Sequence, residues 1–194
     1  MWYSQKEDHI FSMIKEFDPN IVIETKRLVL RYLKESDRHA IFTNINNDKE
    51  VLKYFLDRYL ENEEELLLSN RIKFCLESKR YLFVIELKDT HEVIGMILQC
   101  SAPEGYFNNS EIGYAIGRKY WNKGYVTEAM KAMIGFVFDL GVNKVIASHI
   151  VGNDASKRVI EKCGMIYEGR RKEELFYHEQ YHDVDYYYLL NPNK

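Results

Sequence analysis

The second half of the chain contains two successive strand-to-helix transitions, and this pattern limits the possible folds more than any other feature. An apolar-rich strand is predicted over 111–116. An amphipathic helix is predicted over about 123–140, because its apolar side chains recur every three or four residues. A second strand over 144–151 and a second helix over about 154–163 follow. Strands that alternate with helices in this way bury their apolar sides in one sheet covered by helices. The pattern therefore excludes all-helical and all-strand folds.

The first half and the tail add further strands to the same predicted sheet. Short apolar or alternating runs mark strand candidates at 27–33, 81–85, 93–98, 165–172 and 183–190. The runs at 81–85 and 93–98 are separated by a short polar segment, which predicts a hairpin, and a loop is predicted at 103–105. Two further helices are predicted, one that begins at Ser36 or Asp37 and one over 62–77. The predicted fold class is a mixed α/β (α+β) domain built around one sheet.

The best boundary signal is Asp18-Pro19-Asn20, which separates a predicted short helix over 5–17 from the remainder of the chain. We therefore treat residues 1–23 as an N-terminal extension and residues 24–194 as a single domain. The length of 194 residues and the 46% hydrophobic content are ordinary for one globular domain.

Composition excludes several functional classes. The net charge of −3 gives no basic surplus for coating nucleic acid. The three cysteines lie far apart without a CxxC pair, which indicates neither a disulfide framework nor a cysteine metal site. The N-terminus lacks the apolar core of a signal peptide, and no stretch has the roughly 18 apolar residues of a membrane span. We expect a soluble cytoplasmic protein with no nucleic-acid or membrane partner.

The segment between the strand at 111–116 and the following helix carries the first chemical signal. The first turn of a helix has unpaired N–H groups and a partial positive charge, which suit a phosphate. Gly124 would let a ligand approach the backbone closely. Arg118, Lys119 and Lys123 are unfavourable at this helix end on dipole grounds, and a bound polyanion would remove that penalty. The alternative is a solvated basic turn with a structural glycine. Neither GxxxxGK[ST] nor GxGxxG occurs.

A second polar turn, Val151 to Arg158, follows the next strand. Asn153 and Ser156 lie at the predicted start of its helix. The alternative is plain capping by Asn153 or Asp154. If the two strands are neighbours, the two turns adjoin and form one extended anion cleft.

Taken together, Trp-Asn-Lys-Gly-Tyr-Val-Thr-Glu-Ala at 121–129, Asn153-x-x-Ser156 and Glu-Lys-Cys-Gly-Met at 161–165 resemble the GNAT acetyltransferases. The chain is most similar to their Rim-type branch, which includes enzymes that acetylate the N-termini of ribosomal proteins. The opening Glu-Thr-Lys-Arg-Leu-Val-Leu-Arg at 24–31 fits that branch, and the resemblance covers about 24–191. It implies the GNAT fold: a central mixed, mostly antiparallel sheet of about six to seven strands, with a V-shaped split and flanking helices.

The resemblance also implies that acetyl-CoA lies in the split between strands 111–117 and 144–151. Backbone N–H groups at about 122–127 would hold its pyrophosphate, and the strand backbone near 115–117 would pair with its pantetheine arm. The residues that the resemblance assigns to the cofactor are Ala115, Ile116, Gly117, Trp121, Asn122, Lys123, Gly124, Tyr125, Val126, Thr127, Asn153 and Ser156. It implies no metal. Trp121 and Val126 depart from the family's usual [Q/R]xxGx[G/A] loop. Ile160 stands where many members have a tyrosine that protonates the leaving thiolate.

The reaction implied for this family needs a neutral amine, so a base or a water relay must remove a proton at pH 7. Glu111, at the start of the central strand, is the first candidate base, and His149 on the neighbouring strand is the second. The alternatives are an exposed strand-end carboxylate and a buried core histidine. Tyr114 either lines the acceptor pocket or packs in the core. Backbone N–H groups at 115–117 could stabilise the developing oxyanion, and no covalent enzyme intermediate is required.

A competing motif occurs at 178–182, where His-Glu-Gln-Tyr-His matches the HExxH zinc signature. That chemistry needs a helix, which brings both histidines to one face. The flanking residues favour strands instead. A hairpin near the acceptor site, rich in tyrosine, is therefore the preferred prediction, and a zinc hydrolase is the alternative.

The sequence thus predicts an N-acetyltransferase that uses acetyl-CoA and exists as a monomer or homodimer. A protein N-terminal amine, such as that of a ribosomal protein, is the favoured acceptor. A small polyamine-like or aminoglycoside-like amine is the alternative acceptor. A CoA-binding module that has lost catalysis is the non-enzymatic alternative, and the residue at position 160 keeps it open.

Overall fold

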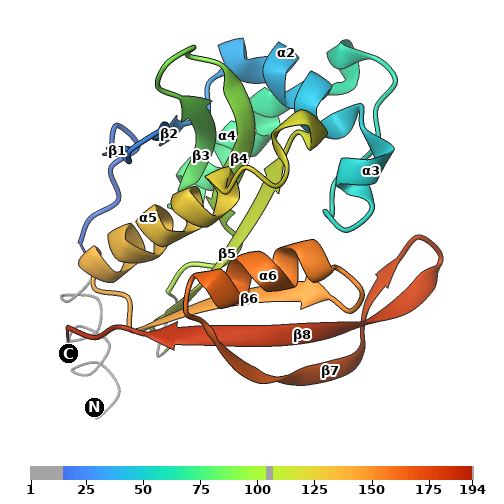
Figure 1. The fold of residues 1–194 in the computed structure, drawn as a ribbon. Helices are drawn as coiled ribbons and strands as arrows, with labels where there is room; N and C mark the ends of the chain where they lie inside the picture. Colours follow the sequence, from blue (N-terminus) through green and yellow to red (C-terminus); the bar gives the residue numbers. More distant parts are fainter. Residues whose placement is uncertain (1–14, 104–106, 194) are drawn as a thin grey trace, which may run out of the picture.

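A computed structural model describes residues 15–103 and 107–193, which form a single open sheet with helices packed on it (Figure 1). The sheet order is β1-β2-β3-β4-β5-β6-β8-β7. The strands are β1 (Val22–Glu24), β2 (Leu28–Tyr32), β3 (Leu82–Leu87), β4 (Val93–Gln99), β5 (Asn109–Ile116), β6 (Lys144–Ile150), β7 (Ile166–Tyr177) and β8 (Gln180–Leu190). The mixed α/β fold is confirmed, but the sheet has eight strands, so the expectation of six to seven is wrong. The unexpected strand is β1, whose three residues are too few to show an alternating pattern.

The helices differ more from the expectation than the strands do. They are η1 (Glu35–Asp37), α2 (Arg38–Ile41), the π-helical η2 (Phe42–Asn46), α3 (Lys49–Leu52), η3 (Glu63–Glu65), α4 (Leu68–Glu77), η4 (Arg118–Tyr120), α5 (Tyr125–Asp139) and α6 (Asp154–Lys162). The helix predicted from Ser36 is divided into short pieces, and Asp48 starts a new one by accepting a hydrogen bond from the Glu50 N–H. No helix within 15–103 or 107–193 has the length and apolar character to cross a bilayer.

One strand pair separates the sheet into two halves. Every neighbouring pair is antiparallel except β5 and β6, which run parallel. Their register covers only Asn109 to Glu111 of β5 against Lys144 to Ile146 of β6. Beyond Glu111 and Ile146 the two strands diverge, which creates the split that the resemblance implies.

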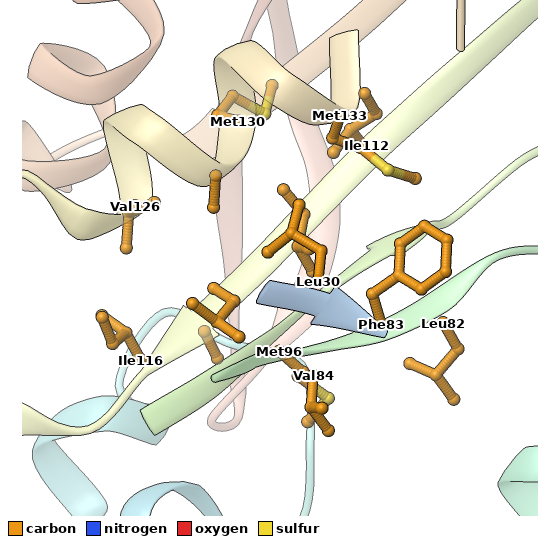
Figure 2. Close-up of a cluster of buried hydrophobic side chains, with 14 of the residues drawn as sticks. Leu30, Leu82, Phe83, Val84, Met96, Ile112, Ile116, Val126, Met130 and Met133 are labelled. Atoms are coloured by element: carbon orange, nitrogen blue, oxygen red, sulfur yellow. The ribbon is translucent and has the colours of Figure 1, made fainter. Parts of the chain in front are cut away.

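The two faces of the sheet are covered by different helices. Figure 2 shows Val126, Met130 and Met133 of α5 pointing toward Ile112 and Ile116 of β5. These side chains are at most 9% exposed. Helix α6 packs beside α5 and against β6. On the opposite face, Arg71 of α4 contacts Met96 Sδ of β4 at 3.7 Å. The apolar core therefore fixes β5 against α5, immediately next to the split.

The described part of the N-terminal extension, residues 15–23, lies against the domain. The Lys15 N–H donates to the Leu140 carbonyl at 2.8 Å, and the Phe17 ring packs 4.8 Å from the Tyr81 ring. Most of the helix predicted over 5–17 lies outside the described residues, as do positions 104 and 105 of the predicted loop. A boundary at residue 23 stays a prediction.

The HExxH segment forms a hairpin and not a helix. His178 and Glu179 both have positive φ, 48° and 61°, and connect β7 to β8 as a two-residue turn. His182 Nε2 lies 2.9 Å from the Tyr177 carbonyl oxygen, within the hairpin itself. In the described residues, no group of three or more His, Cys, Asp and Glu side chains is arranged to hold a metal ion. The zinc hydrolase alternative is therefore wrong, because its two histidines do not share a helix face.

Candidate functional site

The two strands that border the split present backbone groups to each other without pairing. The Gly117 N–H donates to the Ile94 carbonyl and the Cys100 N–H donates to the Glu111 carbonyl, at 2.9 and 2.8 Å. Odd-numbered residues of β5 thus bond to β4. Because backbone groups alternate in direction along an antiparallel strand, Tyr114 and Ile116 direct theirs into the split. On the other side of the split, the Val151 N–H donates to the Asp183 backbone carbonyl, so odd-numbered residues of β6 bond to β8. By the same alternation, Ser148 and Ile150 direct their backbone groups into the split.

This alternation changes one expectation about the strand backbone. Gly117 was expected to offer a free N–H, but that group is engaged with Ile94. Ala115 shares its direction toward β4, and only Ile116 of the 115–117 segment directs its N–H into the split. The Ile116 carbonyl accepts from the Trp121 indole N–H at 2.9 Å. Trp121, which departs from the usual family loop, therefore has a structural role, because its indole N–H bonds the last carbonyl of β5.

The turn between β5 and α5 leaves a helix N-terminus that no described side chain caps. Asn122 and Gly124 have positive φ, 59° and 77°. Gly124 is the N-cap of α5 and gives no side-chain hydrogen bond to the helix. The N–H groups of Tyr125, Val126 and Thr127 thus have no intrahelical acceptor. Uncovered N–H groups at a helix start beside a turn of this shape fit a phosphate.

The basic side chains of this turn are mostly neutralised by carboxylates. Arg118 pairs with Asp48 at 3.1 Å, and Lys119 pairs with Glu92 at 2.7 Å. Lys123 forms no ion pair within the described parts of the chain. Arg118 and Lys119 thus fit the alternative of a basic turn with no ligand, because carboxylates of the protein already balance their charges. Lys123 is the side chain of this turn that can pair with an anionic ligand.

The second turn is held by its own side chains. Asn153 Oδ1 accepts from the Ser156 N–H at 3.1 Å, so Asn153 caps α6 as the simpler alternative predicted. Ser156 Oγ lies 2.7 Å from the Tyr114 hydroxyl, which connects β5 to α6 over the split. Burial raises the pKa of the Tyr114 phenol. A contact between Asn153 or Ser156 and the cofactor stays a prediction.

Glu111 lies at the closed end of the split and has a partner that sequence reasoning missed. Glu111 Oε1 accepts from Ser148 Oγ at 2.7 Å. Both strands contribute to a cavity of about 570 Å³. Its polar lining includes Ser101, Asn109, Glu111, Lys144, Arg171 and Tyr186. In the sequence, the only indication of Ser148 was its place in the strand next to His149. Alternation puts these two side chains on opposite faces of the sheet but does not show which face borders the cavity.

His149 lies on the opposite face of the sheet from Glu111. Consecutive residues of a strand point to opposite sides, so His149 points away from the side on which Ser148 meets Glu111. Its side chain is buried at 6% exposure, and Nδ1 lies 2.9 Å from the Ile150 carbonyl. That contact requires the hydrogen on Nδ1. Nε2 has no partner among the described residues. This arrangement fits the alternative that His149 is a buried core histidine. The side chains of Glu111 and His149 do not reach the same site.

The remaining candidates for acid or nucleophile are weak. Ile160 is fully buried in the core and cannot supply a proton. Cys100 is exposed beside the Glu111 charge, which raises the pKa of its thiol, and burial raises the pKa of the Cys163 thiol to about 11. Both thiols are therefore protonated at neutral pH and are poor nucleophiles.

Comparison with known proteins identifies the family. The sequence model of the acetyltransferase (GNAT) domain matches residues 27–166, which is more than half of the chain. The chain belongs to the GNAT acetyltransferase family. Acetyl-CoA is its cosubstrate, and it is an acyl-CoA-dependent N-acetyltransferase.

Three similar proteins place this GNAT enzyme among its relatives. A GNAT-family acetyltransferase structure from Bacillus anthracis is 28% identical, with a TM-score of 0.77, and 88% of this chain aligns with 99% of that one. The [ribosomal protein uS5]-alanine N-acetyltransferase of Escherichia coli is 24% identical over 85% of this chain and 88% of its own. Spermidine N-acetyltransferase from Vibrio cholerae, solved with CoA and spermine, is 24% identical. Its TM-score is 0.74, and 86% of this chain aligns with 97% of that one. The similarity to the uS5-alanine enzyme supports the Rim-type branch, and these relatives act on different amines.

Proposed function

We propose that this GNAT enzyme acetylates the N-terminal amine of a protein by direct attack on the thioester, in which the C–N bond forms, the C–S bond breaks and CoA leaves as a thiolate that solvent protonates. The observation that carries the proposal is the split between β5 and β6, whose two edges offer unpaired backbone groups and whose open end meets the uncovered N-terminus of α5. Buried backbone groups without partners are costly. An extended ligand with amides and a pyrophosphate supplies both kinds of partner.

Acetyl-CoA supplies an activated acetyl thioester when it is bound. The chain would hold its pyrophosphate with the first N–H groups of α5, and Lys123 would add a positive charge. The Ile116 N–H would pair with an amide of its pantetheine arm along β5. The Tyr114 N–H also faces the split and, three residues along β5 from Glu111, is the better placed donor for a developing oxyanion.

Glu111 is the proposed general base. An amine enters protonated at neutral pH, and a carboxylate at the closed end of the split can accept its proton directly or through a water molecule. Ser148 donates to Glu111 Oε1 at 2.7 Å, which leaves Oε2 free to face the amine. The Ser148 bond fixes the carboxylate rotamer and makes Ser148 a positioning residue.

The protonated thiols support direct transfer without an acyl-enzyme. A cysteine nucleophile acts as its thiolate, and the pKa values of Cys100 and Cys163 lie well above neutrality. A second route through an enzyme-bound thioester would need a thiolate that these environments suppress.

Charge in the cavity provides for a single amine. Lys144, Arg170 and Arg171 border the cavity together with Glu111. These cations pair with Glu168, Asp185 and Glu174, respectively. Because these cations are paired, Glu111 is the one lining carboxylate without a cationic partner among the described residues, so it can balance one ammonium but not the further charges of a polyamine. A peptide N-terminus carries one amine followed by neutral amides. A small polyamine is nevertheless the substrate named for one relative, so it is the second candidate.

Calorimetric titration tests the cofactor assignment. We expect saturable binding of acetyl-CoA and CoA with dissociation constants on the order of micromolar, as for many cosubstrates. ATP shares the adenine and phosphates but lacks the pantetheine arm, so we expect it to bind about 100-fold more weakly. Equal affinity for ATP and CoA, or no CoA binding by folded protein, would contradict the role of the split.

Acceptor competition tests the peptide proposal. We expect kcat/KM for peptides with free N-termini, taken from ribosomal proteins, to exceed that for spermidine by about tenfold or more. An N-terminally blocked version of the same peptide serves as the control and should be inert. Turnover with spermidine above that of every peptide would favour the polyamine. Cofactor binding without turnover of any amine would favour a non-catalytic CoA-binding module.

A further inference from the structure

The carboxylate of Glu128, in the first turns of α5, is held by the turn between β1 and β2. Its Oε1 accepts from Thr25 Oγ1 at 2.7 Å and from the Arg27 N–H at 2.8 Å. Its Oε2 accepts from Arg27 Nε at 2.7 Å. The Glu128 side chain is 20% exposed and the Arg27 side chain is 41% exposed, so these contacts are partly buried. Two segments about 100 residues apart in sequence are thereby joined at one carboxylate.

Arg27 extends this contact to the turn that precedes α5. Its Nη1 donates to the Lys123 carbonyl at 3.0 Å, and its guanidinium lies 4.4 Å from the centroid of the Tyr125 ring. Lys123 and Tyr125 flank Gly124, whose left-handed backbone sets the direction of the uncovered N–H groups. Arg27 therefore contacts the turn on both sides of Gly124.

The charges of the pair matter as much as its geometry. A free carboxylate at the start of α5 would repel a phosphate bound there. Burial alone would raise the pKa of Glu128, but hydrogen bonds from Thr25 and Arg27 lower it below the usual range, so the group stays ionised. Arg27 balances that charge. The Glu128 carboxylate, in turn, fixes the guanidinium in the position from which it reaches Lys123.

We infer that Glu128 and Arg27 are positioning residues for cofactor binding, which hold the 122–125 turn in the shape that receives the pyrophosphate. This inference rests on the proposed acetyl-CoA site. A turn held in its binding conformation before the ligand arrives loses less conformational freedom on binding, and affinity rises accordingly. The Thr-Lys-Arg segment at 25–27 and the Thr-Glu-Ala segment at 127–129 thus both contribute to holding the 122–125 turn.

Two substitutions of opposite charge distinguish positioning from simple electrostatics. Arg27→Met leaves a negative charge near the phosphate site, whereas Glu128→Gln leaves a positive one. If Arg27 acted only through its charge, Glu128→Gln would bind CoA at least as tightly as the wild type. If the pair positions the turn, both variants should raise the calorimetric Kd for CoA by about tenfold, the effect of roughly one charge-assisted hydrogen bond.

A third variant keeps the test decisive if Glu128→Gln folds poorly. Arg27→Lys preserves the cation but cannot bond Glu128 and the Lys123 carbonyl together, so we expect a Kd for CoA raised by about threefold. The unfolding midpoint of each variant is measured alongside. An unchanged Kd in folded Arg27→Lys, or tighter CoA binding by folded Glu128→Gln, would overturn the inference.

Two controls separate this inference from the proposed function. S-acetylpantetheine lacks the phosphates, so its KM as acetyl donor should change less than about twofold in all three variants. Glu77→Gln removes a carboxylate from an exposed ion pair on α4, 3.9 Å from Lys73, and should leave the Kd for CoA unchanged. If the wild type itself fails to bind CoA, the proposed function fails first, and the variants are not needed to show it.

Discussion

Glu111→Gln should lower kcat/KM for the amine acceptor by about 10² to 10⁴-fold at pH 7, the usual contribution of a general base. The substitution keeps the size of the side chain and its bond from Ser148 Oγ but removes the proton acceptor. Binding of acetyl-CoA should stay within about twofold of the wild type, because Glu111 lies at the closed end of the split, away from the α5 N-terminus. Steady-state kinetics and calorimetry on the same preparation measure both quantities.

The pH profile gives this prediction a second readout. The free-amine fraction of the acceptor rises about tenfold per pH unit below the amine pKa, so the deficit of the Glu111→Gln variant should shrink as pH rises. Ser148→Ala should reduce kcat by about tenfold, because it removes one hydrogen bond that orients the carboxylate. Glu77→Gln serves as the matched control and should retain full activity. Wild-type kcat/KM in the Glu111→Gln variant would exclude Glu111 as the base.

Gly95→Ala should destabilise the fold and weaken cofactor binding together. Gly95 of β4 lies opposite Ile116 of β5. A Cβ atom there would overlap the Ala115 carbonyl oxygen and lie 2.8 Å from Ile116 Cα. The contacted atoms belong to the backbone and not to a flexible side chain, so β5 must move. We expect a loss of about 1 to 3 kcal/mol in the free energy of unfolding. For a chain of this length that corresponds to a Tm lower by roughly 3 to 10 °C.

The affinity for acetyl-CoA should fall in the same variant, because the displaced atoms belong to the strand that lines the split. Gly135→Ala is the matched control. Gly135 lies within α5, and a Cβ there would meet nothing within 4 Å. Alanine favours the helix more than glycine does, so this variant should gain about 0.4 to 1 kcal/mol and bind acetyl-CoA normally. A Gly95→Ala variant that melts and binds like the wild type would contradict the close approach of β4 and β5.

Local patterns predicted the second half of the chain well. The helix expected over 123–140 is observed at Tyr125–Asp139, and the strand expected over 144–151 is observed at Lys144–Ile150. Both have strong hydrophobic periodicity, which tertiary contacts reinforce. The segment 36–52 was predicted poorly. It is divided into short α, π and 3₁₀ pieces, because side chains such as Asn44 and Asp48 bond locally and to neighbouring strands and interrupt a continuous helix.

The candidate site shows the same division between local and long-range information. The turn at Gly124 was predicted because a strand, a glycine-containing basic turn and an amphipathic helix are adjacent in sequence. The ion-pair and hydrogen-bond partners of the residues in this turn were not predicted. Asp48, Glu92 and Arg27 lie far away in sequence, yet they decide which cations remain free and how the turn is held. Strand alternation separated Ser148 from His149 but gave no indication of which one faces the cavity.

By itself, the sequence determined that this protein is a mixed α/β domain with a glycine-containing turn before its longest helix, and its motifs indicated the GNAT family. These properties depend on the order and period of neighbouring residues, which a linear chain displays directly. Only the tertiary structure decided that Glu111 and His149 lie on opposite faces, that Gly117 is already bonded, and that Glu128 is joined to Arg27. Those properties arise from contacts between strands and turns that are distant in sequence, where the register and direction of each side chain are set by packing.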